Sequence, residues 1–493
     1  MKKMILAILF IALATPVYAD EAKIPEPETF VTEHTGEFNG TRVRYTATAG
    51  ETYLKDENGA PRASIFSTSY IRTGVKNNES RPVVFLWNGG PGSASLWLHM
   101  GVFGPKRVDI PSDARDDGAA PYRVIDNPGA FLDIADIVFI DPVGTGFSRA
   151  LGETKREEFY SINKDARSVA EFIRIWLNKN KRWNSPKYIG GESYGTTRSA
   201  AVINELEGRF DDVSINGIIL ISSILDFSID TPAPGNEVAF ITVMPTLAAT
   251  AWYHDKVDKT GHTLASFVAA AKEFAIGEYA LALLKGNDLG DDERAAVRAK
   301  LSGFIGISED YIDDADLRVN HSRFQKELLR DEGLSVGRLD SRYQGVDYDN
   351  AGEYPDVDPS FYGIDGAYTA ALNSYMRGDL GVEIERQYSV IGGLGGRWDW
   401  ALEGRDFSRG YLNVAPYIGR AMRENSGLRV FNAMGYYDFA TPMFGAEYSL
   451  KRTGIPDERI TFEYYEAGHM MYIHHPSLHK LLADVRAFIV AGQ

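Results

Sequence analysis

Nucleophilic catalysis by a serine is the chemistry that this sequence suggests first. Ser193 lies in the stretch GESYG, which fits the G-x-S-x-G pattern of a serine raised on a tight turn. Ser335 lies in GLSVG and fits the same pattern equally well. A five-residue pattern in a glycine-rich chain is weak evidence, so the elements on either side must select between the two serines.

The setting of the two serines differs. The short apolar run 187–190 (KYIG) precedes Ser193, and the segment 196–208 that follows it has the composition of a helix. This is the strand–turn–helix order of a nucleophile elbow. Ser335 follows a charged helical stretch and precedes no helix. The sequence therefore predicts Ser193 as the nucleophile.

A serine hydroxyl needs a base, and the base needs a carboxylate that orients it. In folds with a nucleophile elbow, the acid and then the histidine follow the serine, each at the end of a later strand. Asp438 comes just after the apolar run 428–435, and His469 comes just after the run 459–466. Asp399 and Asp406 are alternative acids, but neither follows a convincing strand, and both are expected to be surface carboxylates.

An oxyanion hole is the next requirement of this chemistry. The stretch FLWNGGPGSASLWLHMGVFGP (85–105) places Asn-Gly-Gly-Pro-Gly directly after a strand. Glycines allow backbone N–H groups to face one point without side chains in the way. Taken alone, this stretch would be read as an ordinary Gly-Pro loop.

A metal site is a weaker reading of the histidines near the C-terminus. His475 and His479 are four residues apart, with His474 beside them, which could form one face of a helix. No carboxylate or cysteine completes the set, so a solvated helix start is expected instead. We expect neither a metal nor a cofactor.

The elements that must position these residues indicate an α/β fold. Residues 41–50 and 62–73 alternate like a hairpin with Asn58 and Gly59 at its tip. Apolar runs at 82–87, 136–141, 187–190 and 215–222 alternate with helical segments such as 161–180, which predicts a mixed, mostly parallel sheet with helices on both faces. From residue 228 to about 400 long helical stretches such as 263–286 and 315–333 prevail. We predict a core of 20–227 and 401–493 with a helical insertion at 228–400.

The composition and the first residues of the chain indicate the compartment and the kind of partner to expect. Residues 1–19 combine two lysines, a short apolar run and a small-residue site at Val17-Tyr18-Ala19, as in a cleaved signal peptide. The apolar run is too short to span a bilayer, so no stable membrane insertion is expected. The chain has 52 basic and 68 acidic residues, which disfavours nucleic acid as a partner. Because it has no cysteine, the sequence fits an exported bacterial protein, in periplasm or medium, better than a eukaryotic secreted one.

Five stretches, in this order, resemble the motifs of the serine carboxypeptidase family, which has an α/β-hydrolase fold. They are WNGGPGS, FIDPVGTGFS, GGESYG, YYDFATP and EAGHMMY. The resemblance implies Ser193, Asp438 and His469 as the catalytic triad. It also implies an oxyanion hole from the N–H groups of Gly90 and Tyr194, and recognition of the terminal carboxylate of a peptide by Asn88, Gly89 and Glu192. The implied substrates are peptide or protein C-termini.

The sequence departs from the family pattern at Val102. The family usually has a second glutamate there, paired with the one next to the serine, so half of the carboxylate-binding pair is missing. The family's disulfides are absent too. We therefore expect an exported serine exopeptidase, with an esterase or acyltransferase that uses the same triad as the alternative. A binding protein with an unused triad is a third, less favoured reading. Oligomeric state and side-chain preference stay open.

Overall fold

The computed structural model describes residues 24–208, 211–362, 365–394, 396–403, 411–452 and 454–492. The expected signal peptide and the alternative acid Asp406 lie outside these residues. Among the described residues, no helix is both long and apolar enough to cross a membrane.

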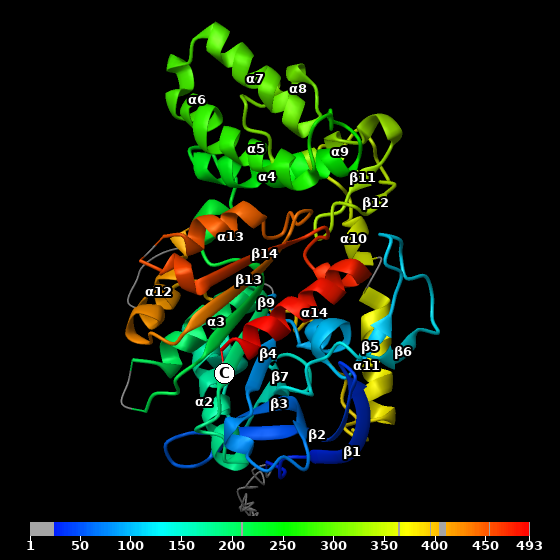
Figure 1. Cartoon of the computed structure of the whole chain (residues 1–493), viewed down its shortest axis with the longest axis vertical. Coiled ribbons are helices and arrows are strands. Elements are labelled where there is room, and N and C mark those ends of the chain that lie inside the picture. Colours follow the sequence, from blue (N-terminus) through cyan, green and yellow to red (C-terminus); the bar gives the residue numbers. More distant parts are fainter. Residues whose placement is uncertain are drawn as a thin grey trace, which may run out of the picture.

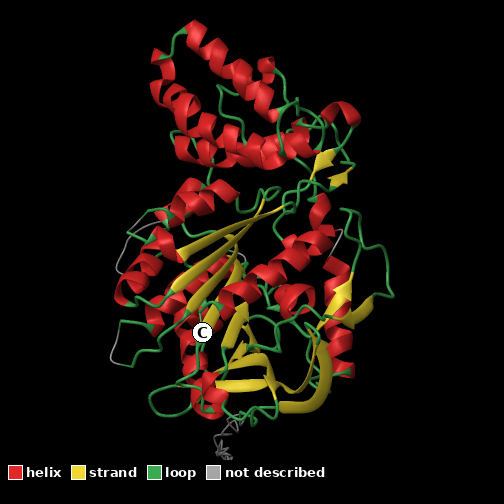
Figure 2. Ribbon diagram, viewed as in Figure 1, coloured by secondary structure: helices red, strands yellow, loops and turns green. Residues whose placement is uncertain are grey.

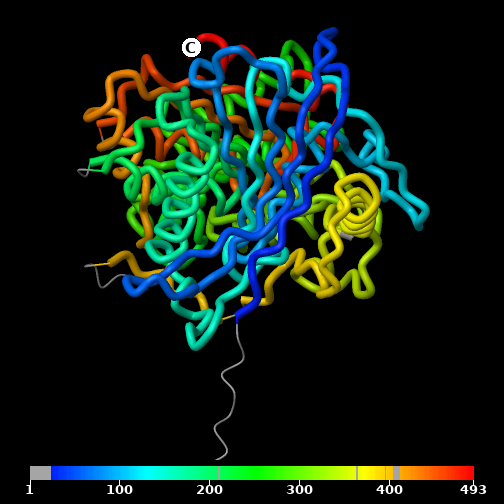
Figure 3. Tube along the Cα trace, turned by 90° about the horizontal axis from the view of Figure 1, so that it is seen from below, coloured from blue at the N-terminus to red at the C-terminus, as the bar shows by residue number. Residues whose placement is uncertain are grey.

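Ten of the described strands form one mixed sheet, which confirms the predicted fold class. Its order is β1-β2-β3-β7-β4-β9-β10-β13-β14, with β8 (Arg149–Ala150) paired to β3. The antiparallel part is formed by β1 (Thr29–Phe38), β2 (Thr41–Lys55) and β3 (Pro61–Arg72). From β7 onwards neighbouring strands are parallel; they are β7 (Asp136–Asp141), β4 (Val83–Trp87), β9 (Lys187–Ser193), β10 (Gly217–Ser223), β13 (Arg429–Gly435) and β14 (Ile460–Tyr465). Seen from below, the N-terminal strands cross the molecule in blue (Figure 3).

Helices cover both faces of this sheet (Figures 1 and 2). Alternation along each strand divides the apolar side chains between the two faces. In β4, Val84 and Leu86 pack on the side of α14 (His475–Val490) and α11 (Asp365–Gly378). Phe85 packs on the other side, with its ring 5.2 Å from that of Trp176. That second side is covered by α2 (Ile162–Asn180), α3 (Tyr194–Leu206) and α12 (Ala415–Glu424).

Between β10 and β13 the chain forms most of its remaining helices. They are α4 (Glu237–Tyr253), α5 (Leu264–Phe274), α6 (Ala280–Lys285), α7 (Asp291–Ile305), α8 (Glu309–Asp314) and α9 (His321–Glu327), followed by the short strands β11 (Ser335–Val336) and β12 (Gln344–Gly345). These helices stand beyond one edge of the sheet and share their own apolar cluster (Figure 1).

The later part of the same segment returns to the sheet. After α10 (Pro359–Tyr362), helix α11 packs beside β5 (Lys106–Asp109) and β6 (Arg123–Asp126). Ser389 then forms a bridge with Gly146, and Asp399 with Ser161. The division of the chain at 228 and 400 remains a prediction.

The long helices predicted in this segment are interrupted. Over 315–333, a helix begins only at His321, because Asp316 and Leu317 have positive φ angles of 50° and 61° that a right-handed helix does not tolerate. Over 263–286, the helix contains a π-helical turn, and Gly277 breaks its regular geometry. Strands β1, β5 and β6 were not predicted from the sequence.

Candidate active site

Ser193 stands where β9 ends and α3 begins. Its backbone has φ 59° and ψ −131°, a conformation that a side-chain-bearing residue rarely adopts. The glycines on either side permit this turn: a Cβ on Gly191 would lie 2.1 Å from the Gly195 carbonyl oxygen. The strand and the helix therefore cross closely at Ser193, as a nucleophile elbow requires.

The surroundings of Ser335, the second candidate serine, differ from those of Ser193. Ser335 lies in β11 and is fully buried. Its hydroxyl donates hydrogen bonds to the Gly345 carbonyl oxygen at 3.4 Å and to Asp347 Oδ1 at 3.2 Å. β11 pairs with β12 in a two-stranded sheet within the segment between β10 and β13. Ser335 does not line the pocket that contains Ser193.

Asp438 and His469 meet beyond the ends of β13 and β14. His469 Nδ1 lies 2.7 Å from Asp438 Oδ2, and both side chains are buried. Because a carboxylate can only accept at this contact, Nδ1 carries the proton and Nε2 is the nitrogen that can act as a base. Asp438 also accepts hydrogen bonds from the Ala440 and Thr441 amides and from the Thr441 hydroxyl. Asp399, the alternative acid, lies on the surface.

The pKa of His469 is raised above its usual value. Burial, the largest effect, acts to lower it, but the charge of Asp438 and the hydrogen bond to it outweigh burial, and Glu192 adds to the rise. Arg338 opposes this rise with its positive charge. A carboxylate-paired imidazole of this kind is more basic than a free one, which suits it to accept the proton of a serine.

The glycine loop after β4 lies directly against the elbow. A Cβ on Gly89 would lie 2.6 Å from both the Tyr194 amide nitrogen and the Glu192 carbonyl oxygen, so only glycine fits there. Gly90 has φ 104°, in the region that glycine favours. Gly90 and Tyr194, the predicted oxyanion-hole residues, both line the pocket that contains Ser193.

Asn88 and Glu192 form a buried polar end of this pocket. The Asn88 side-chain oxygen accepts from the Leu98 amide at 3.0 Å, so its NH₂ group is the end that donates toward Glu192. Burial raises the pKa of Glu192 to about 7, although the charge of His469 and hydrogen bonds from Tyr472 and Asn88 act to lower it. The Tyr472 hydroxyl donates to Glu192 Oε2 at 2.7 Å.

Val102, the position at which the family pattern has a second glutamate, is not part of this end of the pocket. It is fully buried in the π-helical turn His99–Phe103 and does not line the pocket. The neighbouring Gly101 packs against the Tyr472 ring, since a Cβ on it would lie 2.5 Å from that ring. The tyrosine therefore supplies Glu192 with the polar contact that Val102 does not provide.

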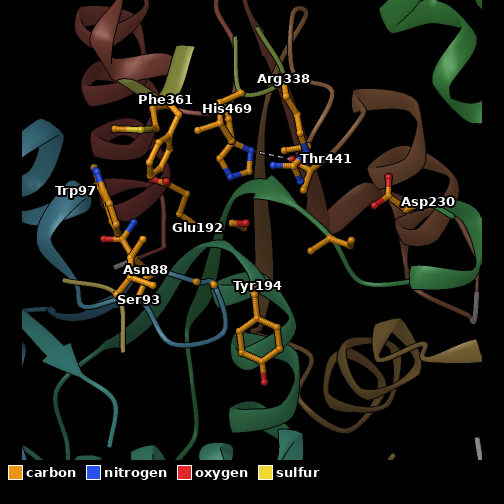
Figure 4. Close-up of a pocket in the computed structure, with 18 of the residues that line it drawn as sticks. Asn88, Ser93, Trp97, Glu192, Tyr194, Asp230, Arg338, Phe361, Thr441 and His469 are labelled. Carbon is orange, nitrogen blue, oxygen red and sulfur yellow. Dashed lines mark hydrogen bonds between the residues drawn. The ribbon is translucent and has the colours of Figure 1, made fainter. Parts of the chain in front are cut away.

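All eight predicted site residues except Asp438 line one pocket of about 250 Å³. Asp438 reaches it through His469. In Figure 4, Glu192 lies below His469, Asn88 and Trp97 lie on one side, and Thr441 and Asp230 lie on the other. Arg338 and Phe361, from the segment between β10 and β13, close the pocket from above.

A metal site is not supported by the part of the chain that the structure describes, where no group of three or more His, Asp or Glu residues could hold an ion. His475 is the first residue of α14, and His479 is exposed one turn later.

Two residues of the site were missed from the sequence. Thr441 follows Asp438 by three residues. At this spacing a threonine hydroxyl can donate a hydrogen bond to the carboxylate at the start of the same turn, so the sequence did indicate this contact. Tyr472 follows His469 by three residues, and no local pattern connects it to Glu192, 280 positions away.

Comparison with known proteins gives one consistent family. The model of the family described as serine carboxypeptidase matches residues 63–269, which include the glycine loop and Ser193 but not Asp438 or His469. Serine carboxypeptidase-like 13 of Arabidopsis thaliana is 28% identical over 159 residues, which cover 32% of this chain and 36% of that protein. Serine carboxypeptidase-like 2 of the same plant is 26% identical over 171 residues, covering 33% and 37%. The matches thus span little more than a third of these relatives.

The solved structure of Kex1(Δ)p, a prohormone-processing carboxypeptidase from Saccharomyces cerevisiae, resembles the chain over most of its length. The likeness covers 90% of this chain and 91% of that one, with a TM-score of 0.54 and 14% identity. At this identity the likeness shows the fold, which is that of the α/β hydrolases.

Proposed function

Because the chain belongs to the serine carboxypeptidase family, we propose that it is a serine-type carboxypeptidase that removes C-terminal residues through an acyl-enzyme on Ser193. Ser193 attacks the last peptide carbonyl while His469 Nε2 takes its proton. The N–H groups of Gly90 and Tyr194 stabilise the oxyanion. His469 then gives the proton to the leaving amino acid, and water releases the acyl group by the same steps in reverse order.

The observation that carries the exopeptidase reading is the buried carboxyl of Glu192 next to the nucleophile. Below pH 7 the acid is mainly protonated, because its pKa is about 7. In that form it donates a hydrogen bond to the terminal carboxylate of a peptide, which an ionised glutamate would repel. The Asn88 amide and the Gly89 backbone complete the carboxylate-binding end. A pocket built for an ester alone has no use for a protonated acid at this place.

The test compares matched peptides that differ only at the C-terminus. We expect kcat/KM for the free acid to exceed that for the amide by at least about 10-fold at pH 5.5, and this ratio to fall as pH rises through 7. Mass spectrometry of the products should show residues lost one at a time from the C-terminus. Ser193→Ala serves as the control for contaminating peptidases.

The esterase or acyltransferase reading gives a different result. Equal rates on the free and amidated peptides, together with much faster hydrolysis of the matching ester, would overturn the carboxypeptidase proposal. Val102 is the feature that favours this alternative, because it removes one carboxyl group from the usual pair.

We also propose that the enzyme acts outside the cytoplasm. The support is the sequence MKKMILAILFIALATPVYAD, with its two lysines, apolar run and small-residue site. Protein taken from the exported fraction should begin at Asp20 on N-terminal sequencing, and material that retains Met1 would contradict the proposal.

A further inference from the structure

A short segment after β11 lies between the two loops that carry Asp438 and His469. We call residues 338–342 the bridging segment. On the acid side, the Phe439 amide donates to the Arg338 carbonyl oxygen at 3.0 Å, and the Ser341 amide donates to the Tyr437 carbonyl oxygen at 2.9 Å. These bonds fix the residues on either side of Asp438.

On the base side the bridging segment is bonded just as closely. The His469 amide donates to the Leu339 carbonyl oxygen at 2.6 Å. The Gly468 amide donates to Asp340 Oδ2 at 3.0 Å. A Cβ on Gly468 would lie 2.3 Å from the Leu339 carbonyl oxygen and 2.5 Å from Asp340 Cα, so the two backbones are in direct contact.

Asp340 is held rigidly in this position. Arg342 contacts both of its oxygens, through Nε to Oδ1 at 2.9 Å and through Nη2 to Oδ2 at 2.5 Å. The side chains of the pair are 2% and 5% exposed. The Ser360 hydroxyl accepts hydrogen bonds from the Leu339 and Asp340 amides at 3.0 and 3.2 Å.

We infer that the bridging segment sets the separation of the acid and base loops, and that Asp340 is a positioning residue for His469. The inference rests on the proposed catalytic roles of Ser193, Asp438 and His469. Proton transfer between them depends on placement within a fraction of an ångström. The two loops also contact each other directly, because the Tyr437 amide donates to the Ala467 carbonyl oxygen at 3.1 Å. The helical part of the molecule adds a second link between them, and this link bonds to His469 itself.

Asp340→Asn tests this inference with little change in shape. An amide offers one acceptor oxygen instead of two, so it cannot hold both Arg342 and the Gly468 amide as the carboxylate does. We expect the rate at which a fluorophosphonate labels Ser193 to fall about 10- to 100-fold, and kcat on peptides to fall in parallel. KM should change less than about 3-fold, because Asn88 and Glu192 are untouched.

Asp347→Asn is the matched control. Lys326 and Asp347 form a second buried ion pair in the same helical part of the chain, with side chains 1% and 4% exposed. The hydrogen bonds of Asp347 go to Lys326 and Ser335, and none goes to the loops of Asp438 or His469. We expect a comparable loss of thermal stability in both variants, but a labelling rate within about 2-fold of wild type for Asp347→Asn alone.

The outcomes separate the inference from the proposed function. Equal labelling rates in Asp340→Asn, Asp347→Asn and wild type would overturn the inference. If Asp340→Asn does not fold, Ser360→Ala decides: it removes the hydroxyl that binds the Leu339 and Asp340 amides and leaves the Asp340–Arg342 pair in place. A labelling rate equal to wild type would again overturn the inference. A wild type that reacts with the phosphonate but removes no C-terminal residues would refute the peptidase proposal, while the labelling comparison would still test the bridging segment.

Discussion

Glu192 is the residue whose chemistry depends most on its surroundings. An ordinary glutamate is ionised at neutral pH, whereas burial brings this pKa to about 7 against the opposing influence of His469, Tyr472 and Asn88. The folded protein therefore keeps a proton here that the unfolded chain has already lost at pH 5 to 7. Folding stability must fall as pH rises through that interval, because the folded state binds more protons than the unfolded state.

Glu192→Gln should remove this contribution. Between pH 4.5 and 7 the carboxyl contributes a fall of up to roughly 3 kcal/mol in the free energy of unfolding, because burial raises its pKa from 4.5 to about 7 in the folded protein. The free energy of unfolding of the glutamine variant, taken relative to that of wild type, should therefore be higher at pH 8 than at pH 5. Urea titrations of both proteins at the two pH values measure this difference. A difference that does not change with pH would contradict the assigned pKa.

Tyr472→Phe should shift the pH dependence of substrate selection. The hydroxyl bond favours the ionised form of Glu192, so its loss raises the pKa of that acid further. The preference for free over amidated C-termini should then persist to a pH about one unit higher than in wild type. Tyr375→Phe is the control, because its buried hydroxyl contacts Tyr70 instead. The measurement is the ratio of kcat/KM values across pH, and a midpoint shared by all three proteins would disprove this role of Tyr472.

The two serines predict opposite outcomes on substitution. Ser193→Ala should lower kcat by about 10³-fold or more with little change in KM. Ser335→Ala, which removes two hydrogen bonds in β11, should leave kcat unchanged and reduce stability by about 1 kcal/mol. Steady-state kinetics and thermal unfolding of both variants provide the check. Loss of activity in Ser335→Ala alone would mean that the elbow was assigned to the wrong serine.

At the scale of elements, the close approach of the glycine loop to the elbow has the sharpest consequence. Gly89→Ala places a Cβ 2.6 Å from two backbone atoms of the elbow, well inside normal contact. One of the two must move, and a displacement near 1 Å in a catalytic site lowers rates about 100-fold. Gly303→Ala is the control, because its Cβ would meet nothing within 4 Å in α7 and should stabilise the helix by up to about 1 kcal/mol. Phosphonate labelling and thermal unfolding distinguish the two; a fully active Gly89→Ala would refute the tight packing.

Elements with strong local patterns were predictable, and those that depend on distant contacts were not. The central strands β4, β7, β9, β10 and β13 are apolar runs, and β14 is rich in aromatic and β-branched residues. Ser193, Asp438 and His469 lie at or beyond the carboxyl ends of β9, β13 and β14, as the sequence predicted. β1 carries alternating polar residues at the edge of the sheet, so its sequence gives little signal. Two other features have no local pattern: the contact of Tyr472 with Glu192, and the contacts of the bridging segment with the loops of Asp438 and His469. Both form only when parts of the chain that are distant in sequence pack together.

At the scale of the whole molecule, we expect the helical part and the sheet to unfold together. Phe439, one residue after Asp438, belongs to the apolar cluster of α4 to α9, with its ring 5.9 Å from that of Phe324. Of the seven tryptophans, only Trp252 lies in those helices. Urea unfolding followed by tryptophan fluorescence should therefore coincide with unfolding followed by far-ultraviolet circular dichroism. Two separated transitions would show that the parts are independent.

The way in which the bridging segment is bonded bears on how this protein can evolve. Carbonyl and amide groups of Arg338, Leu339 and Ser341 make most of the contacts to the catalytic loops, and every residue type except proline carries both groups. Selection can therefore replace nearly all side chains of the helical part, and with them its substrate preference, without disturbing the geometry at Ser193. Four residues are exceptions: Asp340 contributes a carboxylate, Arg342 and Ser360 hold the segment through their side chains, and Gly468 must lack a side chain. Sequence change around these few fixed positions would let substrate specificity diverge rapidly while the reaction itself is inherited unchanged.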